Sequence, residues 1–196
     1  MSDSIVTRRS FMAAAAGVGG VFLASGWVET AQAAERRFAK VAQGGRARYK
    51  ALSVEDADDL IVLTEQIMPT DETPGAREAG VVFFVDESLV RAKDNKQLKT
   101  DLQAMLTTIN SEAAKRYPGK GRAAKLTLNE QHALVEWLTK EHGNHFGLLK
   151  GMTAAGMFAM PSRGGNRNKA GWKLIGFKDQ FSWASPYGWY DTKGNS

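Results

Sequence analysis

The sequence has no cysteine among its 196 residues. This absence excludes disulfide bonds, thiolate zinc sites, cysteine-ligated iron–sulfur clusters, covalently attached c-type haem and cysteine nucleophiles. Long hydrophobic runs are also missing, since no stretch reaches the roughly 20 uninterrupted apolar residues that a helix needs to span a bilayer. A polytopic membrane protein is therefore excluded, and the 43% of hydrophobic residues is typical of a globular domain.

Positive charge exceeds negative charge only slightly, with 26 Lys and Arg against 21 Asp and Glu. The basic residues are scattered along the chain and do not gather on one predicted helix, as they do in proteins that bind nucleic acids. We therefore expect no nucleic-acid partner.

Residues 1–33 have the charged start, apolar middle and small-residue end of an export signal. Arg8 and Arg9 are followed by a polar residue and then by Phe11, a pattern that resembles the twin-arginine motif. A Sec signal is the alternative, but the modest hydrophobicity of the middle part favours the twin-arginine route. The signal ends in an A-x-A site, which predicts cleavage between Ala33 and Ala34.

A twin-arginine signal implies export of a protein that has already folded, and such cargo commonly carries a cofactor. The rest of the chain, however, contains no dinucleotide fingerprint, P-loop, G-x-S-x-G or HExxH element. Either a cofactor is held without a recognisable motif, or the folded cargo is a complex in which the cofactor belongs to a partner.

Beyond the signal, we expect a flexible basic leader over 34–52, a helical domain over 53–160 and an irregular tail over 161–196. The helical domain is predicted from amphipathic periodicity and capping signals, with no convincing alternating strand, so the fold class is all-α. The five predicted helices cover residues 53–68, 73–90, 95–116, 127–143 and 144–158.

Three capping signals set the starts of these helices. Ser53 is an N-cap, Thr73 is an N-cap followed by Pro74 at the first helical position, and Thr127 forms a capping box with Glu130. The acidic residues between positions 55 and 72 are expected to form a solvated helix face.

The tail is rich in glycine and holds seven of the chain's eighteen aromatic residues between positions 172 and 190, interleaved with Lys and Arg. Two interpretations are open. The aromatic residues pack back onto the chain's own helices, because such side chains bury well on any surface. Alternatively they bind a partner, because Trp, Tyr and Arg are enriched at interface hot spots.

A metal site is the competing candidate. His142 and His145 lie three residues apart with Glu141 beside them, but Gly143 separates them and no third ligand is identifiable. Three methionines near the end of the last predicted helix are expected to be core residues, not haem ligands. These are Met152, Met157 and Met160.

Three sequence blocks carry a resemblance to a known family. They are Ile-Met-Pro-Thr-Asp-Glu-Thr-Pro-Gly-Ala-Arg-Glu-Ala-Gly-Val at 67–81, Gly-Met-Phe at 156–158, and the stretch from Gly-Gly-Asn-Arg at 164–167 to Gly-Trp-Lys-Leu-Ile-Gly-Phe at 171–177. Together with the twin-arginine start, they resemble the gluconate 2-dehydrogenase subunit 3 family. The chain departs from that pattern at 160–163, where an acidic residue and an aromatic are expected.

The resemblance implies the non-catalytic small subunit of a periplasmic, membrane-attached sugar or polyol dehydrogenase. FAD would then belong to a large partner subunit and haem c to a possible cytochrome c subunit, with no cofactor in this chain. The implied task is to escort the flavin subunit through the twin-arginine translocon and to stabilise it in the periplasm. The alternative is a stand-alone periplasmic protein that binds a metal or a sugar.

The partner interface is predicted in the tail, where glycines would let the backbone lie flat against the large subunit. The residues expected at this interface are Gly164, Gly165, Asn166, Trp172, Phe177, Trp183, Trp189 and Tyr190.

Overall fold

The structure is a computed structural model that describes residues 49–92, 96–161 and 164–179. Within these residues the chain forms six α-helices and no strand, which confirms the all-α prediction. The helices are α3 Val54–Ile67, α4 Val81–Arg91, α5 Lys96–Arg116, α6 Leu128–Glu141, α7 Gly143–Phe158 and α8 Ala170–Leu174. No helix in this described part of the chain has the length and apolar character needed to cross a membrane.

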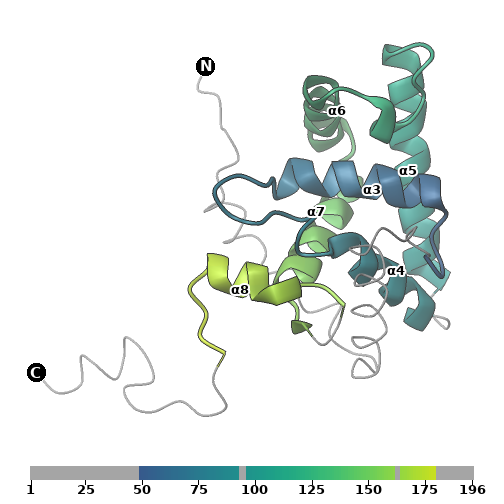
Figure 1. Cartoon of the computed structure of the whole chain (residues 1–196). Helices are drawn as coiled ribbons and strands as arrows, with labels where there is room; N and C mark the ends of the chain where they lie inside the picture. The colour runs from purple at the N-terminus through teal and green to yellow at the C-terminus, as the bar shows by residue number, and fades with distance from the viewer. Residues whose placement is uncertain (1–48, 93–95, 162–163, 180–196) are drawn as a thin grey trace, which may run out of the picture.

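Helix α7 is the centre of the domain, and it contacts α3, α4, α5, α6 and α8. In Figure 1, α3 crosses in front of α7, while α6 lies above α3 and α8 lies below it. The largest fully buried side chains include Leu60 and Leu63 of α3, Leu106 of α5, Leu134 of α6 and Met152 of α7. One continuous core therefore joins the four helices that supply these residues.

Two of the predicted caps are confirmed. The Ser53 side chain accepts a hydrogen bond from the backbone N–H of Asp56 at 3.0 Å and starts α3. Thr127 and Glu130 form the predicted capping box at the start of α6. These caps supply acceptors for helix N–H groups that have no partner inside the helix.

The predicted start of the second helix at Thr73 is wrong, because α4 begins only at Val81. Residues 76–80 form turns instead, and the Ala76 N–H donates to the carbonyl oxygen of Met68 at 2.8 Å. Gly75 lies so close to the backbone of residues 68–70 that a Cβ would clash there. Gly80, with φ of 72°, then turns the chain into α4.

The end of the predicted flexible leader is fixed to α4. Asp86 is fully buried, and its carboxylate accepts hydrogen bonds from the backbone N–H groups of Lys50, Ala51 and Leu52 at 2.8–3.0 Å. The Lys50 ammonium pairs with Glu87 at 3.2 Å. The leader prediction is therefore corrected for residues 49–52, whereas residues 34–48 lie outside the described part.

The acidic stretch is not simply a solvated face. Asp59 is fully buried, and it accepts hydrogen bonds from the Ala124 N–H at 2.9 Å and the Asn110 side chain at 2.8 Å. Arg122 pairs with Asp59 at 2.8 Å and also with Asp56 at 3.0 Å. The connector between α5 and α6 is thereby held against α3, because a buried carboxylate needs such partners.

Candidate partner interface

The three sequence blocks of the predicted family converge where α4 begins and α7 ends. Gly156 of α7 faces Val81, and a Cβ at Gly156 would lie 3.0 Å from a Val81 methyl carbon. Gly165 lies against the backbone of Gly156, and Gly171 lies against the carbonyl of Met157. Any side chain at Gly165 or Gly171 would meet backbone atoms that cannot move aside. We call Val81, Gly156, Gly165 and Gly171 the glycine junction.

Asn166 holds this junction together. It is fully buried and has a left-handed backbone with φ of 47°. Its N–H donates to Gly156 at 2.6 Å, its side-chain amide donates to the Ala159 carbonyl at 2.9 Å, and its amide oxygen accepts the Gly171 N–H at 2.8 Å. One side chain therefore ties the end of α7 to the start of α8.

The next residues extend this attachment to the turn that precedes α4. The Arg167 N–H donates to the carbonyl oxygen of Ala79 at 3.1 Å. Trp172 is half-buried, its indole N–H donates to the Phe158 carbonyl at 3.0 Å, and its ring meets that of Phe177 edge-on at 5.0 Å. The segment from Gly165 to Trp172 is thus part of the helical domain.

Two exposed residues in this loop have left-handed backbones although neither is glycine. Asn168 has φ of 54° and Lys169 has φ of 57°. The loop stays in this shape because Asn166 fixes both of its ends, and because the Lys169 ammonium pairs with Asp179 at 2.8 Å. Backbone strain of this kind is retained only where the surrounding structure enforces it.

The predicted interface residues therefore have different positions. Gly165 and Asn166 are buried against the chain's own α7, so their glycine and amide character serves packing within the domain. For residues 165–172 the structure favours the interpretation in which the tail packs onto its own helices. Gly164 is half-buried and has φ of 90°. Eight other predicted interface and signal residues lie outside the described residues, namely Trp183, Trp189, Tyr190, Arg8, Arg9, Phe11, Ala33 and Ala34.

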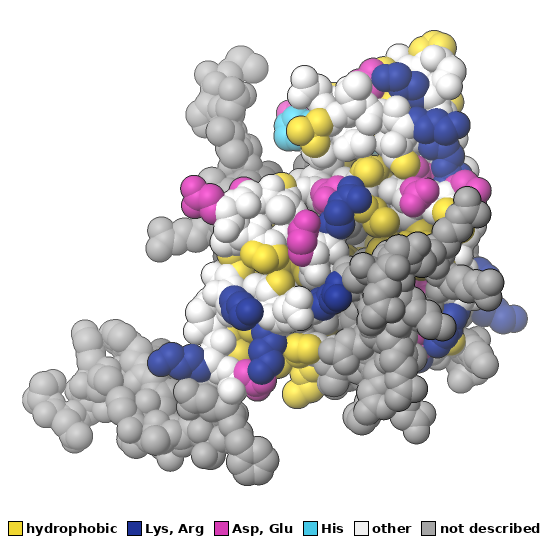
Figure 2. All heavy atoms as spheres, viewed as in Figure 1, with side chains coloured by type: hydrophobic (Ala, Val, Ile, Leu, Met, Phe, Trp, Pro, Cys, Tyr) yellow, Lys and Arg dark blue, Asp and Glu magenta, His cyan; other side chains and the backbone are white. Residues whose placement is uncertain are grey.

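The glycine junction supports a set of exposed apolar side chains. Met160, Ile175 and Phe177 are 55%, 42% and 45% exposed. Lys173 and Lys178 are exposed beside them in the sequence. We call these five residues the α8 surface. Figure 2 shows dark blue Lys and Arg side chains beside yellow hydrophobic ones in the region that α8 occupies.

Sequence reasoning named Phe177 but missed Met160 and Ile175. Helical spacing from Met157 predicts Met160 in the core, but α7 ends at Phe158 and Met160 is exposed. Proline at position 161 was the signal that marks this end, since the residue before proline is disfavoured in a helix. Ile175 carries no comparable signal, because its exposure depends on how α8 sits on α7.

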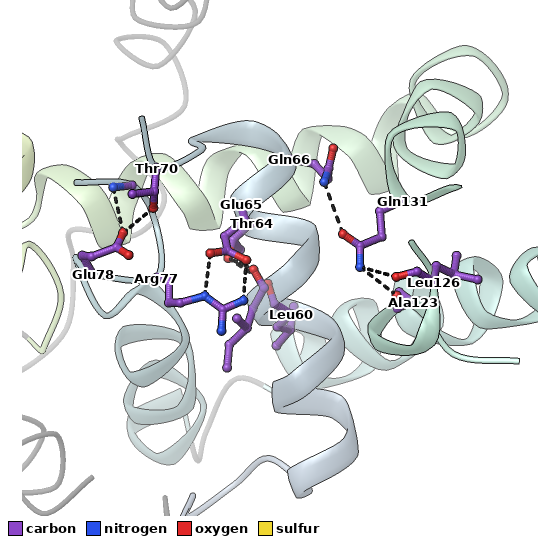
Figure 3. A network of polar contacts seen from close by, with 12 residues as sticks. Leu60, Thr64, Glu65, Gln66, Thr70, Arg77, Glu78, Ala123, Leu126 and Gln131 are labelled. Carbon is purple, nitrogen blue, oxygen red and sulfur yellow. Dashed lines mark hydrogen bonds and ion pairs between the residues drawn. The ribbon is translucent and has the colours of Figure 1, made fainter. Parts of the chain in front are cut away.

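The turn before α4 is held by side chains, as Figure 3 shows. Glu78 accepts hydrogen bonds from the Thr70 hydroxyl and from the Gly75 N–H at 2.9 Å. Partial burial acts to raise the pKa of Glu78, but these hydrogen bonds outweigh it and the pKa is lowered. Arg77 forms a two-pronged ion pair with Glu65 of α3. The turn is thereby anchored to α3.

Two of the three histidines form an aromatic cluster at the corner between α6 and α7. The His142 and His145 rings stack with centroids 5.7 Å apart, and Trp137 meets His142 edge-on at 4.8 Å. The Arg116 guanidinium lies 5.4 Å from the Trp137 ring centre. Across 49–92, 96–161 and 164–179, no three His, Cys, Asp or Glu residues are placed to hold a metal ion.

The three methionines that could ligate a haem iron have different positions in the structure. Met152 and Met157 are buried in the core, as the sequence predicts, at 1% and 0% exposure. Met160 instead belongs to the α8 surface.

Comparison with known proteins gives one family match and one partial relative. The model of the family described as gluconate 2-dehydrogenase subunit 3 matches residues 55–179. Formamidopyrimidine-DNA glycosylase of Heliobacterium modesticaldum is 32% identical over 102 residues, which are 48% of this chain and 35% of that enzyme. The chain thus spans about a third of that relative's length. No solved structure is significantly similar. The family match begins in the first turn of α3 and runs past α8, so the chain belongs to the gluconate 2-dehydrogenase subunit 3 family.

Proposed function

We propose that this chain is the non-catalytic small subunit of a periplasmic, FAD-dependent sugar or polyol dehydrogenase complex. Membership of the family supports association with a dehydrogenase complex. In this proposal the large subunit carries FAD and the catalytic residues, and a cytochrome c subunit accepts the electrons. The small subunit would reside in the periplasm and attach peripherally to the inner membrane through its partners.

The observation that carries this proposal is the α8 surface. The family-matched segment uses its glycines and Asn166 to build a rigid attachment to α7, and it leaves Met160, Ile175 and Phe177 exposed. Large apolar side chains that a rigid support holds exposed are typical of a protein–protein interface. A binding role explains both the tight internal packing and the outward apolar groups.

The escort role rests on the twin-arginine signal. A folded flavin subunit without its own signal would be exported because it is bound to this chain in the cytoplasm. The aromatic residues beyond Asp179, Trp183, Trp189 and Tyr190 among them, would extend the interface from the α8 surface.

A mild pull-down of the tagged chain from its native cell, followed by an absorption spectrum, tests this function. We expect a large partner in stoichiometric amount with a flavin spectrum, with or without haem bands. A lone, colourless chain would contradict the proposal and favour the stand-alone metal- or sugar-binding alternative. Metal analysis and sugar-binding measurements on that chain would then separate the two.

A further inference from the structure

We infer that the α8 surface is the site at which this chain docks onto the flavin-carrying subunit, and that the receiving surface is an apolar hollow with an acidic rim. This inference rests on the proposed function and deepens it. It also moves the interface from the buried residues Gly165 and Asn166 to the exposed residues Met160, Ile175 and Phe177.

The first argument is the shape of the support. Met160 follows α7 by two residues, and Ile175 directly follows α8, whose start is fixed to α7 through Asn166 and Gly171. The Ile175 N–H donates to Gly171 at 3.2 Å and the Phe177 N–H donates to Trp172 at 2.8 Å. The apolar side chains are therefore held on fixed backbone, which reduces the entropy lost when a partner covers them.

The second argument is charge. Between residues 160 and 179 the sequence has five Lys and Arg residues and a single acidic residue, Asp179. Asp179 is paired with Lys169, so it does not offset the charge of Lys173 and Lys178. A surface that carries both apolar and Lys side chains is complementary to an apolar hollow with Asp and Glu at its edge. From this charge pattern we infer that the partner's docking surface is acidic at its edge.

The third argument is the strained loop beside the surface. Asn168 and Lys169 keep left-handed backbones although both side chains are exposed. Packing of the core does not require their side chains, yet the loop keeps its shape through the buried contacts of Asn166. Backbone strain that the surrounding structure enforces is concentrated at functional sites, including those that clamp a ligand.

The decisive experiment removes the exposed apolar groups and leaves the junction intact. A full-length Met160→Ser, Ile175→Ser variant is expressed in the native cell, and bound flavin per small subunit is measured after pull-down. The matched control is Val54→Ser, Leu128→Ser, because those two side chains are 55% and 72% exposed at the first positions of α3 and α6. We expect the affinity to fall at least about tenfold in the α8 variant and to stay unchanged in the control.

A second pair of variants tests the charge of the partner. Lys173→Glu, Lys178→Glu is expected to weaken capture of the flavin subunit and to reduce the dependence of capture on salt concentration. The control is Lys96→Glu, Lys99→Glu on α5, which changes the net charge equally at two exposed positions. Equal weakening by both charge variants would indicate a general charge effect and would overturn the acidic rim.

Each other outcome decides against the inference in a recognisable way. Full capture by the apolar α8 variant would overturn the docking site while the proposed function stands. If deletion of residues 180–196 alone abolishes capture, the interface lies in the tail. If the purified chain is a dimer that the apolar α8 variant dissociates, the occupant is a second copy. If the unmodified chain captures no flavin protein, the proposed function fails and the inference fails with it.

Discussion

At the residue scale, Asn166 combines two properties that few residues share. Its short amide side chain tolerates the left-handed backbone, and the amide group both donates and accepts a hydrogen bond. Here it donates to the Ala159 carbonyl and accepts from the Gly171 N–H. Aspartate lacks the donor at neutral pH, and glycine lacks the side chain. The position therefore specifies asparagine for reasons internal to the domain.

We predict that Asn166→Ala lowers the free energy of unfolding by about 3 kcal/mol, because it leaves a buried N–H and a carbonyl without partners and adds backbone strain. The matched control is Asn168→Ala, which alters an exposed asparagine with a similar backbone, φ of 54° against 47°. The control is expected to lose only about 1 kcal/mol. Urea unfolding of both variants measures the difference, and equal losses would contradict the role given to the Asn166 side chain.

At the element scale, the sequence predicts a helix start correctly where hydrogen bonds between residues close in the chain determine it. The caps at Ser53 and Thr127 work through atoms three residues away, and both were predicted correctly. The false start at Thr73 shows the limit of such reasoning. Helix formation there competes with the contact between Gly75 and the backbone of residues 68–70, and that contact depends on the path of the preceding chain.

The sequence predicts which segment forms the candidate site, but not which of its residues face α7 and which are exposed. The block from Gly164 onward was assigned to an interface, because glycines and aromatics occur together there. Sequence alone does not say which side of a glycine the neighbouring backbone occupies, so it predicts Gly165 at the partner interface although Gly165 packs against α7. Likewise, the sequence predicts Asp59 on a solvated helix face. It is buried, and Arg122, from the connector between α5 and α6, pairs with it.

The attachment of residues 50–52 to α4 gives a prediction for this element. Asp86→Asn should expose the peptide bond after Lys50 to trypsin, because a neutral amide with a single acceptor oxygen replaces the carboxylate that binds three consecutive N–H groups. We expect cleavage there to be about tenfold faster, which corresponds to a loss of about 1.4 kcal/mol in the closed state.

Mass spectrometry of timed digests identifies this cut. Asp58→Asn makes the same chemical change at an exposed position of α3 and is expected to leave the rate unchanged. A urea titration distinguishes local release from global unfolding of the variant. An unchanged cleavage rate in Asp86→Asn would show that other contacts hold residues 49–52.

At the scale of the whole molecule, the segments on both sides of the helical domain attach near α4. Residues 50–52 bind Asp86 within α4, and Arg167 binds Ala79 just before α4. The α8 surface and the last residues of the leader are therefore both fixed to the same folded body. In the proposed function, the leader connects the folded domain to the export signal at 1–33 and the α8 surface binds the flavin subunit, so the folded domain is the physical link between signal and cargo.

This link predicts the result of altering the signal. Arg8→Lys, Arg9→Lys should leave both the small subunit and the flavin subunit in the cytoplasm, because the cargo has no other connection to the translocon. Cell fractionation with flavin absorbance and antibodies against both chains measures this distribution. The same fractionation of Met160→Ser, Ile175→Ser should give an exported small subunit and a cytoplasmic flavin subunit, since that variant keeps the signal and loses the docking site. Export of the flavin subunit in the arginine variant would refute the escort role, because the cargo would then reach the periplasm independently of this chain.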